Sequence, residues 1–76
     1  MSHQDLTAAF GKVVRRRRER LGISQEELAH KAGLHRTYIG MLERGQRTPS
    51  LLTVALVAKA LGASVAALVK GLDRHV

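Results

Sequence analysis

The sequence predicts an all-α protein made of five short helices, and three observations support this. Apolar residues recur at helical intervals, and no segment shows the pattern of a β-strand. Capping residues and glycines divide the chain into segments of helical length. Ala29, Gly33 and Ile39 have the spacing of two helices joined by a sharp turn. The 76 residues are therefore expected to form a single domain, with its core within about residues 6–70.

The first helix is expected over about residues 5–21. Its apolar stripe consists of Leu6, Phe10, Val13, Val14 and Leu21. We expect residues 1–4 and 72–76 to be frayed ends of the domain.

The second helix begins at a capping box, in which Ser24 is the N-cap and Glu27 lies three residues later. The helix is expected to end near Ala32, because Gly33 can adopt the positive φ that a tight reversal requires. Ala29 has too small a side chain to keep the following helix away. These residues predict the first half of a helix-turn-helix.

The third helix is expected over about residues 36–44, with Gly45 as its stop signal. Its N-cap would be His35, which is a weaker cap than Ser, Thr or Asp. Ile39 and Leu42 fall on the face that packs against the second and fourth helices. The other face is left to project outward, where such a helix can enter a DNA groove.

The fourth helix is expected to open with Thr48 as its N-cap and Pro49 at its first position. It should end near Leu61, before a glycine. Ser64 then caps a short fifth helix that reaches about Lys70.

The charge balance is strongly basic and uneven along the chain. Thirteen Lys and Arg oppose six Asp and Glu, which gives a net charge of +7. Ten of the basic residues and only four of the acidic residues lie within residues 12–47. A positive field on this part suits a polyanion such as nucleic acid, although many small proteins are basic for solubility alone.

Several classes of function find no support in the sequence. There is no cysteine, no apolar run of membrane-spanning length and no glycine-rich phosphate loop. His30 and His35 are five residues apart and do not share a helix face as metal ligands should. We therefore expect a cytoplasmic, nucleoid-associated protein that is not an enzyme, with no metal, cofactor, membrane partner or evident small-molecule effector.

The outward side of the third helix carries the candidate base-reading residues Arg36, Thr37, Gly40 and Met41. Arg36 can make a bidentate contact with guanine, and Thr37 offers a hydroxyl and a methyl group. Gly40 would allow close access to the groove floor, and Met41 would make apolar contact. The alternative is that Arg36 and Met41 are solvated surface residues.

Four further residues are candidates for contact with the phosphate backbone. Gln25 is at the first position of the second helix, where backbone donors and the helix dipole favour an anion. Tyr38 lies at the flank of the third helix, and Arg47 and Thr48 follow that helix. Gln25 would otherwise be a solvent-exposed neighbour of the cap.

A second apolar face on the fourth helix predicts a homodimer. Leu52 and Leu56 lie at i and i+4 outside the core-facing side, and Val65 and Val69 extend this character into the fifth helix. Leu51, in contrast, is expected to face the core. The alternative is that this short chain wraps both faces into a single core.

The chain resembles the Cro/repressor-type helix-turn-helix family, also called the xenobiotic-response-element family. The matching segments are residues 24–29 (SQEELA), 31–33 (KAG), 43–45 (ERG), 49–51 (PSL) and 58–62 (AKALG), with Ile39 between them. Within the family, residues 36–39 are similar to restriction–modification controller proteins. His35 and Gly40 depart from the family pattern, so no base-reading code can be copied from a relative.

The resemblance implies a five-helix, lambda-repressor-like domain in which Gln25 and the third helix face double-stranded DNA. It also implies a structural ion pair between Arg18 and Glu43. Arg15 and Arg16, two further members of the arginine run, either touch a flanking backbone or stay solvated; an amphipathic membrane helix is the third reading, but its apolar face is needed for the core.

The function implied is that of a transcriptional regulator that binds a palindromic operator as a dimer. The alternative is a protein-interaction module, such as an antitoxin or an adaptor, built on the same fold.

Overall fold

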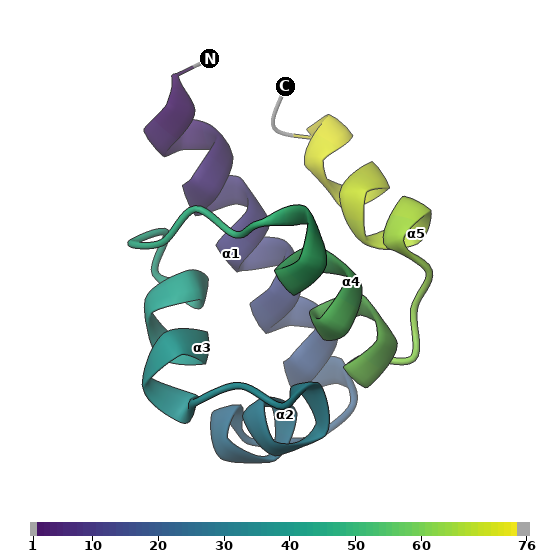
Figure 1. Ribbon diagram of the computed structural model, residues 1–76. Helices are drawn as coiled ribbons and strands as arrows, with labels where there is room; N and C mark the ends of the chain where they lie inside the picture. Colours follow the sequence, from purple (N-terminus) through teal and green to yellow (C-terminus); the bar gives the residue numbers. More distant parts are fainter. Residues whose placement is uncertain (1, 75–76) are drawn as a thin grey trace.

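The computed structural model describes residues 2–74 and contains five α-helices followed by a short 3-10 helix (Figure 1). The elements are α1 (His3–Arg20), α2 (Gln25–Ala32), α3 (Arg36–Glu43), α4 (Leu51–Ala60), α5 (Val65–Lys70) and η1 (Gly71–Arg74). No strand is present in this part of the chain. The all-α, five-helix fold predicted from the sequence is confirmed.

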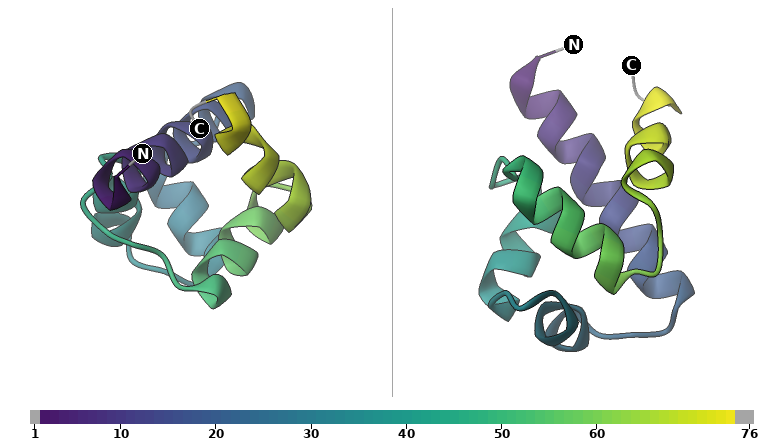
Figure 2. Two further views of the ribbon diagram at one scale, coloured as in Figure 1. Left: turned by 90° about the horizontal axis from the view of Figure 1, so that it is seen from above. Right: turned by 45° about the vertical axis from the view of Figure 1, so that its right-hand side comes forward.

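The long helix α1 packs against α3, α5 and η1, while α2 packs against α3 and α4. α3 and α5 lie on opposite sides of α1, and α4 passes between them (Figures 1 and 2). The largest fully buried side chains come from all five helices: Val14, Leu28, Ile39, Leu42, Val57 and Leu68. Burial of one such side chain stabilises the fold by about 1.5–3 kcal/mol, so the helices are held mainly by this shared core.

The turn between α2 and α3 has the geometry that the sequence predicted. Ser24 and Glu27 form both hydrogen bonds of the capping box. Gly33 ends α2 in the left-handed conformation, with φ of 71°. Ala29 and Ile39 are buried beside the turn. The Gly33 turn and the burial of Ala29 and Ile39 set the angle between α2 and α3, and this angle decides how α3 is presented.

A close approach of α1 to the end of α3 depends on Gly11. A Cβ atom at this position would lie 2.5 Å from the carbonyl oxygen of Leu42 and 2.6 Å from that of Glu43. Only glycine fits there without displacing one of the two helices. This approach brings the C-terminal half of α1 beside Glu43.

The beginning of α1 differs from the prediction. The helix starts at His3, because Ser2 is its N-cap and forms a capping box with Asp5. Residues 2–4 are therefore part of the folded domain rather than a frayed tail, and Met1 lies outside the described residues. Leu6 and Leu21 are 42% and 53% exposed, so the ends of the predicted apolar stripe do not reach the core.

The beginning of α4 also differs. Its N-cap is Ser50, whose hydroxyl accepts a hydrogen bond from the amide of Thr53, and the predicted N-cap Thr48 lies outside the helix. The hydroxyl of Thr48 instead forms a hydrogen bond with the side chain of His3. The later start leaves Leu51 in the first turn with 79% of its surface exposed, whereas the sequence placed it in the core.

Residues beyond α5 are ordered further than predicted. α5 ends at Lys70 as expected, but Gly71–Arg74 continues as η1 and packs against α1. Leu72 is partly buried against the core, which supplies the anchor that the sequence did not reveal. Residues 75–76 lie outside the described residues.

Among the described helices, none is by itself both long enough and apolar enough to cross a membrane. α4 and the segment Val65–Asp73 reach this length and apolar character only when taken together, and the two segments are bent by 102° relative to each other.

Candidate nucleic-acid interface

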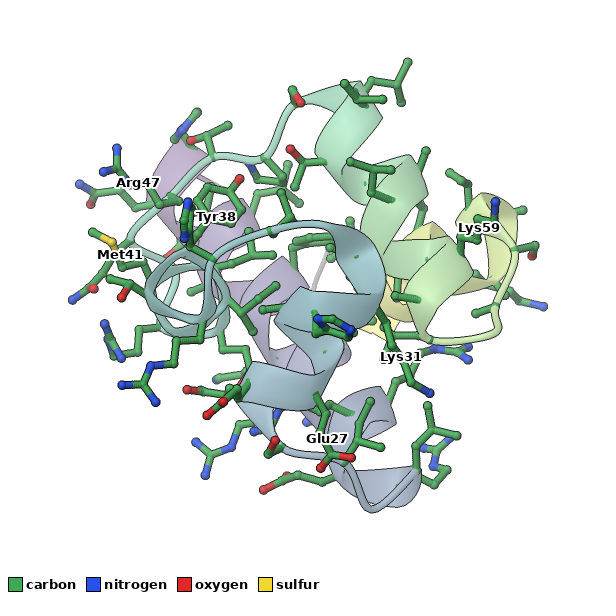
Figure 3. The ribbon with its side chains drawn as sticks, turned by 60° about the horizontal axis from the view of Figure 1, so that its bottom comes forward. Glu27, Lys31, Tyr38, Met41, Arg47 and Lys59 are labelled. Carbon is green, nitrogen blue, oxygen red and sulfur yellow. The ribbon has the colours of Figure 1, made fainter. Side chains whose placement is uncertain are left out.

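The outer side of α3 lies at the surface, with Arg36 and Thr37 exposed at its first turn. Tyr38 and Met41 are half-buried farther along the helix, and Figure 3 shows them with Arg47 on the same side of the molecule. The structure thus brings most of the predicted base- and phosphate-contacting residues to one surface. His35 is the N-cap and makes no side-chain capping bond, as its residue type predicted.

Arg36 is held by a single exposed contact. Its Nη1 lies 3.2 Å from Oε2 of Glu26, and both side chains are more than two-thirds exposed, at 72% and 73%. An exposed pair of this kind contributes only about 0–1 kcal/mol. The Arg36 guanidinium can therefore exchange Glu26 for another acceptor at little cost.

Glu43 is the centre of a buried polar network beneath this surface. Arg18 donates two hydrogen bonds to its carboxylate, at 2.6 Å and 3.0 Å, and a third to the carbonyl oxygen of Ile23 at 2.9 Å. The side chains of Arg18 and Glu43 are only 12% and 3% exposed. The hydrogen bond with Glu43 is the main reason that the pKa of Arg18 is raised. The ion pair implied by the resemblance is present, and it joins α1 to the end of α3.

Gln25 belongs to the same network. Its Nε2 donates a 3.0 Å hydrogen bond to Oε1 of Glu43, and the side chain is half-buried. One N–H of the side-chain amide is therefore used inside the protein, and the amide carries a second N–H donor. This bond locks the first residue of α2 onto the last residue of α3, which fixes the two helices relative to each other.

Gly40 is buried, although the sequence placed it on the open side of α3. A Cβ atom at Gly40 would lie 3.2 Å from Nη1 of Arg44 and 3.4 Å from Oε1 of Gln25. The missing side chain thus makes room for these two neighbours, and Gly40 lines a hollow between α2 and α3. Arg44 is an exposed cation beside this position, and it also donates a hydrogen bond to Gln46.

The segment after α3 is anchored to the start of α1. Arg47 and Thr48 are both exposed, and Oγ1 of Thr48 lies 2.7 Å from Nε2 of His3. His3 was missed by the sequence analysis because it lay in the predicted tail. No local pattern links residues 45 positions apart.

The predicted dimer residues lie on α4 and α5, away from the exposed side of α3. Leu52 is 69% exposed, Val65 37% and Val69 43%, while Leu56 is half-buried. Leu51 adds a further exposed apolar side chain at the start of α4. We call Leu51, Leu52, Leu56, Val65 and Val69 the α4–α5 apolar surface.

Within residues 2–74 the His, Asp and Glu side chains form no group of three that could hold a metal ion. Five helices around one core, with a fixed α2–α3 pair presenting a polar outer face, define a lambda-repressor-like helix-turn-helix protein.

Comparison with known families agrees with this class. The family model described as "Helix-turn-helix" matches residues 14–68. The control protein C.SmaI of Serratia marcescens is 46% identical over 61 residues, which cover 80% of this chain and 73% of that protein. The chain belongs to the helix-turn-helix family.

Solved structures extend the likeness to three dimensions. The restriction-modification controller protein C.AhdI from Aeromonas hydrophila superposes with a TM-score of 0.80 at 42% identity, covering 82% of this chain and 94% of that one. The controller protein C.Esp1396I, solved as a tetramer in complex with its natural 35 base-pair operator, gives a TM-score of 0.85 at 31% identity, with 92% of each chain covered. The particular resemblance is thus to restriction-modification controller proteins.

Proposed function

We propose that this protein is a sequence-specific transcriptional regulator that binds a palindromic operator as a symmetric homodimer. The main support for the proposal is the arrangement of α3. Its outer side has exposed residues, and the Arg18–Glu43–Gln25 network beneath it fixes the helix in place. Such a frame holds a recognition helix rigid while its side chains remain free to contact base edges. The operator complex of C.Esp1396I, a protein of the same fold, supports DNA as the partner.

Each side chain at this surface has a task that its environment permits. Arg36 reads guanine after leaving Glu26, and Thr37 and Met41 contact neighbouring bases. Tyr38, Arg47 and Thr48 bind phosphates along the adjoining backbone. Gln25 contributes mainly by positioning α3 through Glu43, and its place at the start of α2 brings the phosphate close to that helix end.

The homodimer forms through the α4–α5 apolar surface. One module of this size covers too little DNA for tight specific binding, so two copies on half-sites about 34 Å apart are the usual arrangement. The exposed leucines of α4 would be buried between the two copies. This raises both the affinity and the requirement for a symmetric site.

The experiment is selection of binding sequences from a random duplex library, followed by affinity measurements at several salt concentrations. We expect an inverted repeat to be enriched, with affinity for it falling steeply as salt rises. Sedimentation should show a dimer that Leu52→Glu converts to a monomer with weaker operator binding. Recovery of unrelated sequences, or a monomer at tens of micromolar with and without DNA, would contradict the proposal.

The same data separate this function from that of a protein-interaction module. For such a module, Arg36→Ala would leave function intact while changes at Leu52 or Leu56 abolished it. For a DNA-binding regulator, Arg36→Ala weakens operator binding directly.

A further inference from the structure

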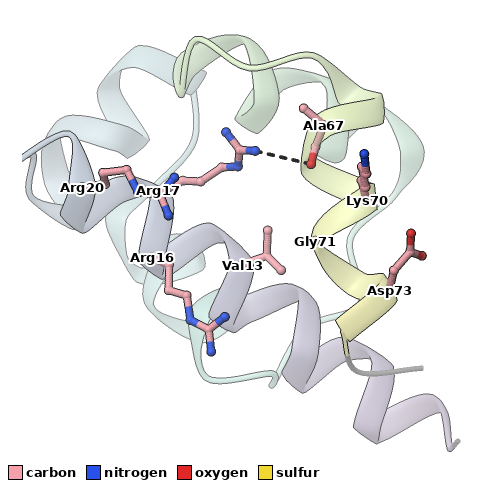
Figure 4. A pocket seen from close by; sticks show the side chains of 8 residues that line it. All are labelled: Val13, Arg16, Arg17, Arg20, Ala67, Lys70, Gly71 and Asp73. Atoms are coloured by element: carbon pink, nitrogen blue, oxygen red, sulfur yellow. Dashed lines mark hydrogen bonds between the residues drawn. The ribbon is translucent and has the colours of Figure 1, made fainter.

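A second basic hollow lies between α1 and the α5–η1 segment (Figure 4). Arg16, Arg17 and Arg20 reach it from α1, and Lys70 and Asp73 from the other side. It shares no lining residue with the hollow between α2 and α3 beside the candidate DNA surface. No residue that lines this hollow has a role in the function proposed above.

The cations of this hollow stand out because nearly every carboxylate in the chain is committed elsewhere. The chain has six acidic residues. Five of them are engaged outside the hollow: Asp5 with Ser2, Glu19 with Arg15, Glu26 with Arg36, Glu27 with Ser24 and Glu43 with Arg18. Among the described residues, Asp73 is the one acidic side chain that lines the hollow with the four cationic side chains.

No ion pair joins Asp73 to these cations within the described residues. The three ion pairs found there are those of Arg15, Arg18 and Arg36. The arginine run is thus divided: Arg15 and Arg18 have carboxylate partners, whereas Arg16 and Arg17 do not. Clustered cations without counter-charges repel one another, and an anion between them removes this cost.

The hollow also has a defined shape. Nη2 of Arg17 donates a 3.4 Å hydrogen bond to the carbonyl oxygen of Ala67, which directs this half-buried side chain across the gap. A Cβ atom at Gly71 would lie 3.0 Å from a methyl group of Val13, a tight contact that the glycine avoids where η1 approaches α1. Arg17 keeps further N–H donors, because a guanidinium carries five.

We propose that this hollow binds a phosphate-bearing anion. Arginine guanidinium groups match two phosphate oxygens at once, and three arginines with one lysine suit a ligand that carries several phosphate charges. The chemistry has two possible sources, namely a soluble polyphosphate-type ligand or the backbone of a second nucleic-acid segment. The inference does not depend on the operator-binding function, because the two surfaces have no residue in common.

The test is titration of the ¹⁵N-labelled protein with inorganic tripolyphosphate at constant ionic strength. Saturable shifts are expected for residues 13–20 and 67–73, with residues 36–41 unaffected. The triple variant Arg16→Gln, Arg20→Gln, Lys70→Gln should weaken this binding at least about tenfold. The three side chains are exposed, and Arg17 is kept because it holds α5, so the variant should fold.

A matched control removes the same charge elsewhere. Lys12→Gln, Lys31→Gln and Lys59→Gln together replace three exposed lysines that do not line the hollow. This variant should retain most of the binding. Equal losses in the two variants, or shifts centred on α3, would overturn the proposal, because they would show attraction by net charge or by the DNA surface.

The source of the phosphate is resolved with a short duplex that lacks the operator sequence. If tripolyphosphate binds in the hollow and the duplex does not, the ligand is a soluble anion. If the duplex binds and the hollow variant loses that binding while the control keeps it, the ligand is nucleic acid. Absence of saturable binding by both probes at about 1 mM would overturn the inference.

Discussion

The α2–α3 pair and the α4–α5 pair occupy the same small core but are held in different ways. α2 and α3 share apolar core contacts and are also joined by the hydrogen bond from Gln25 to Glu43, while the Arg18–Glu43 pair ties α3 to α1. In α4 and α5 the side-chain hydrogen bonds are almost entirely those of the N-caps Ser50 and Ser64. Their remaining contacts are mainly apolar, apart from the hydrogen bond that Arg17 donates to the carbonyl oxygen of Ala67 in α5.

This difference corresponds to two kinds of surface. Polar contacts are directional, so they hold α3 at one angle and suit a surface that must match a groove. Apolar contacts are non-directional, and α4 and α5 leave Leu51, Leu52, Val65 and Val69 exposed. A surface of this kind suits association with another apolar surface. The predictions below test this contrast.

Removal of Glu43 should have the largest effect. Glu43→Ala leaves the buried guanidinium of Arg18 without its partner and should destabilise the domain by about 3–5 kcal/mol. The measurement is urea denaturation followed by circular dichroism. Glu26→Ala, which breaks the exposed pair with Arg36, should cost less than about 1 kcal/mol. Similar losses of unfolding free energy in the two variants would mean that burial does not determine how much these ion pairs contribute to stability.

Removal of Arg36 should affect binding and leave stability unchanged. Arg36→Ala should weaken binding to the selected operator by about 1–3 kcal/mol, because a bidentate base contact is lost. Fluorescence anisotropy with operator and scrambled duplexes measures the change, and the loss should be confined to the operator. Lys59→Ala removes an equal charge from α4 and is the control. An equal loss of affinity for both duplexes would show that Arg36 contacts the DNA backbone rather than a base.

Removal of the α4 cap should have a smaller effect. Ser50→Ala removes the acceptor for the amide of Thr53 and should cost about 1 kcal/mol of unfolding free energy. Thr48→Ala is the comparison: Thr48 lies outside the helix and loses only an exposed hydrogen bond with His3, so this change should cost less than Ser50→Ala. The reverse order would place the start of α4 at Thr48.

The α2 cap should make stability depend weakly on pH. Hydrogen bonds from the backbone and side chain of Ser24 lower the pKa of Glu27 from its ordinary value of 4.5. A lowered pKa in the folded state adds stability above pH 4.5, and this is lost as pH falls through the folded value. Glu27→Gln removes the titration, so the stability difference from the unmodified protein should shrink in acid.

The control for this pH effect comes from the other helix pair. Position three of α4 is Thr53, which carries no charge, so the cost of Ser50→Ala should not vary over the same pH range. Both variants are compared by chemical denaturation at several pH values between about 3 and 7, the range in which carboxyl groups titrate. A parallel pH dependence in the two variants would falsify the role assigned to Glu27.

Local features of the chain were predicted well. Ser24 and Glu27 form their capping box, Gly33 ends α2 in the left-handed conformation, and Ser64 caps α5. Each of these features depends on residues only a few positions apart, so their spacing in the sequence is enough to predict it. The prediction was wrong for the start of α4, where Thr48 and Ser50 are both capable caps and the local pattern does not choose between them.

The candidate site was predicted in part. The exposed position of Arg36 follows from the helical periodicity that buries Ile39 and Leu42. The burial of Gly40 does not follow from periodicity, because it depends on Arg44 and on Gln25 from another helix. The Arg18–Glu43 pair was inferred from family resemblance, since no spacing rule connects residues 25 positions apart.

The sequence by itself determined the number of helices, the sharp α2–α3 turn and the identity of most core residues, because capping and periodicity are local properties. Only the tertiary structure decided that Gln25 binds Glu43, that His3 meets Thr48 and that Arg16 and Arg17 line a hollow beside α5 with no carboxylate partner among residues 2–74. Such contacts depend on the distances and angles between helices. These are set by close approaches such as that at Gly11, where the absence of one carbon atom lets two distant segments meet.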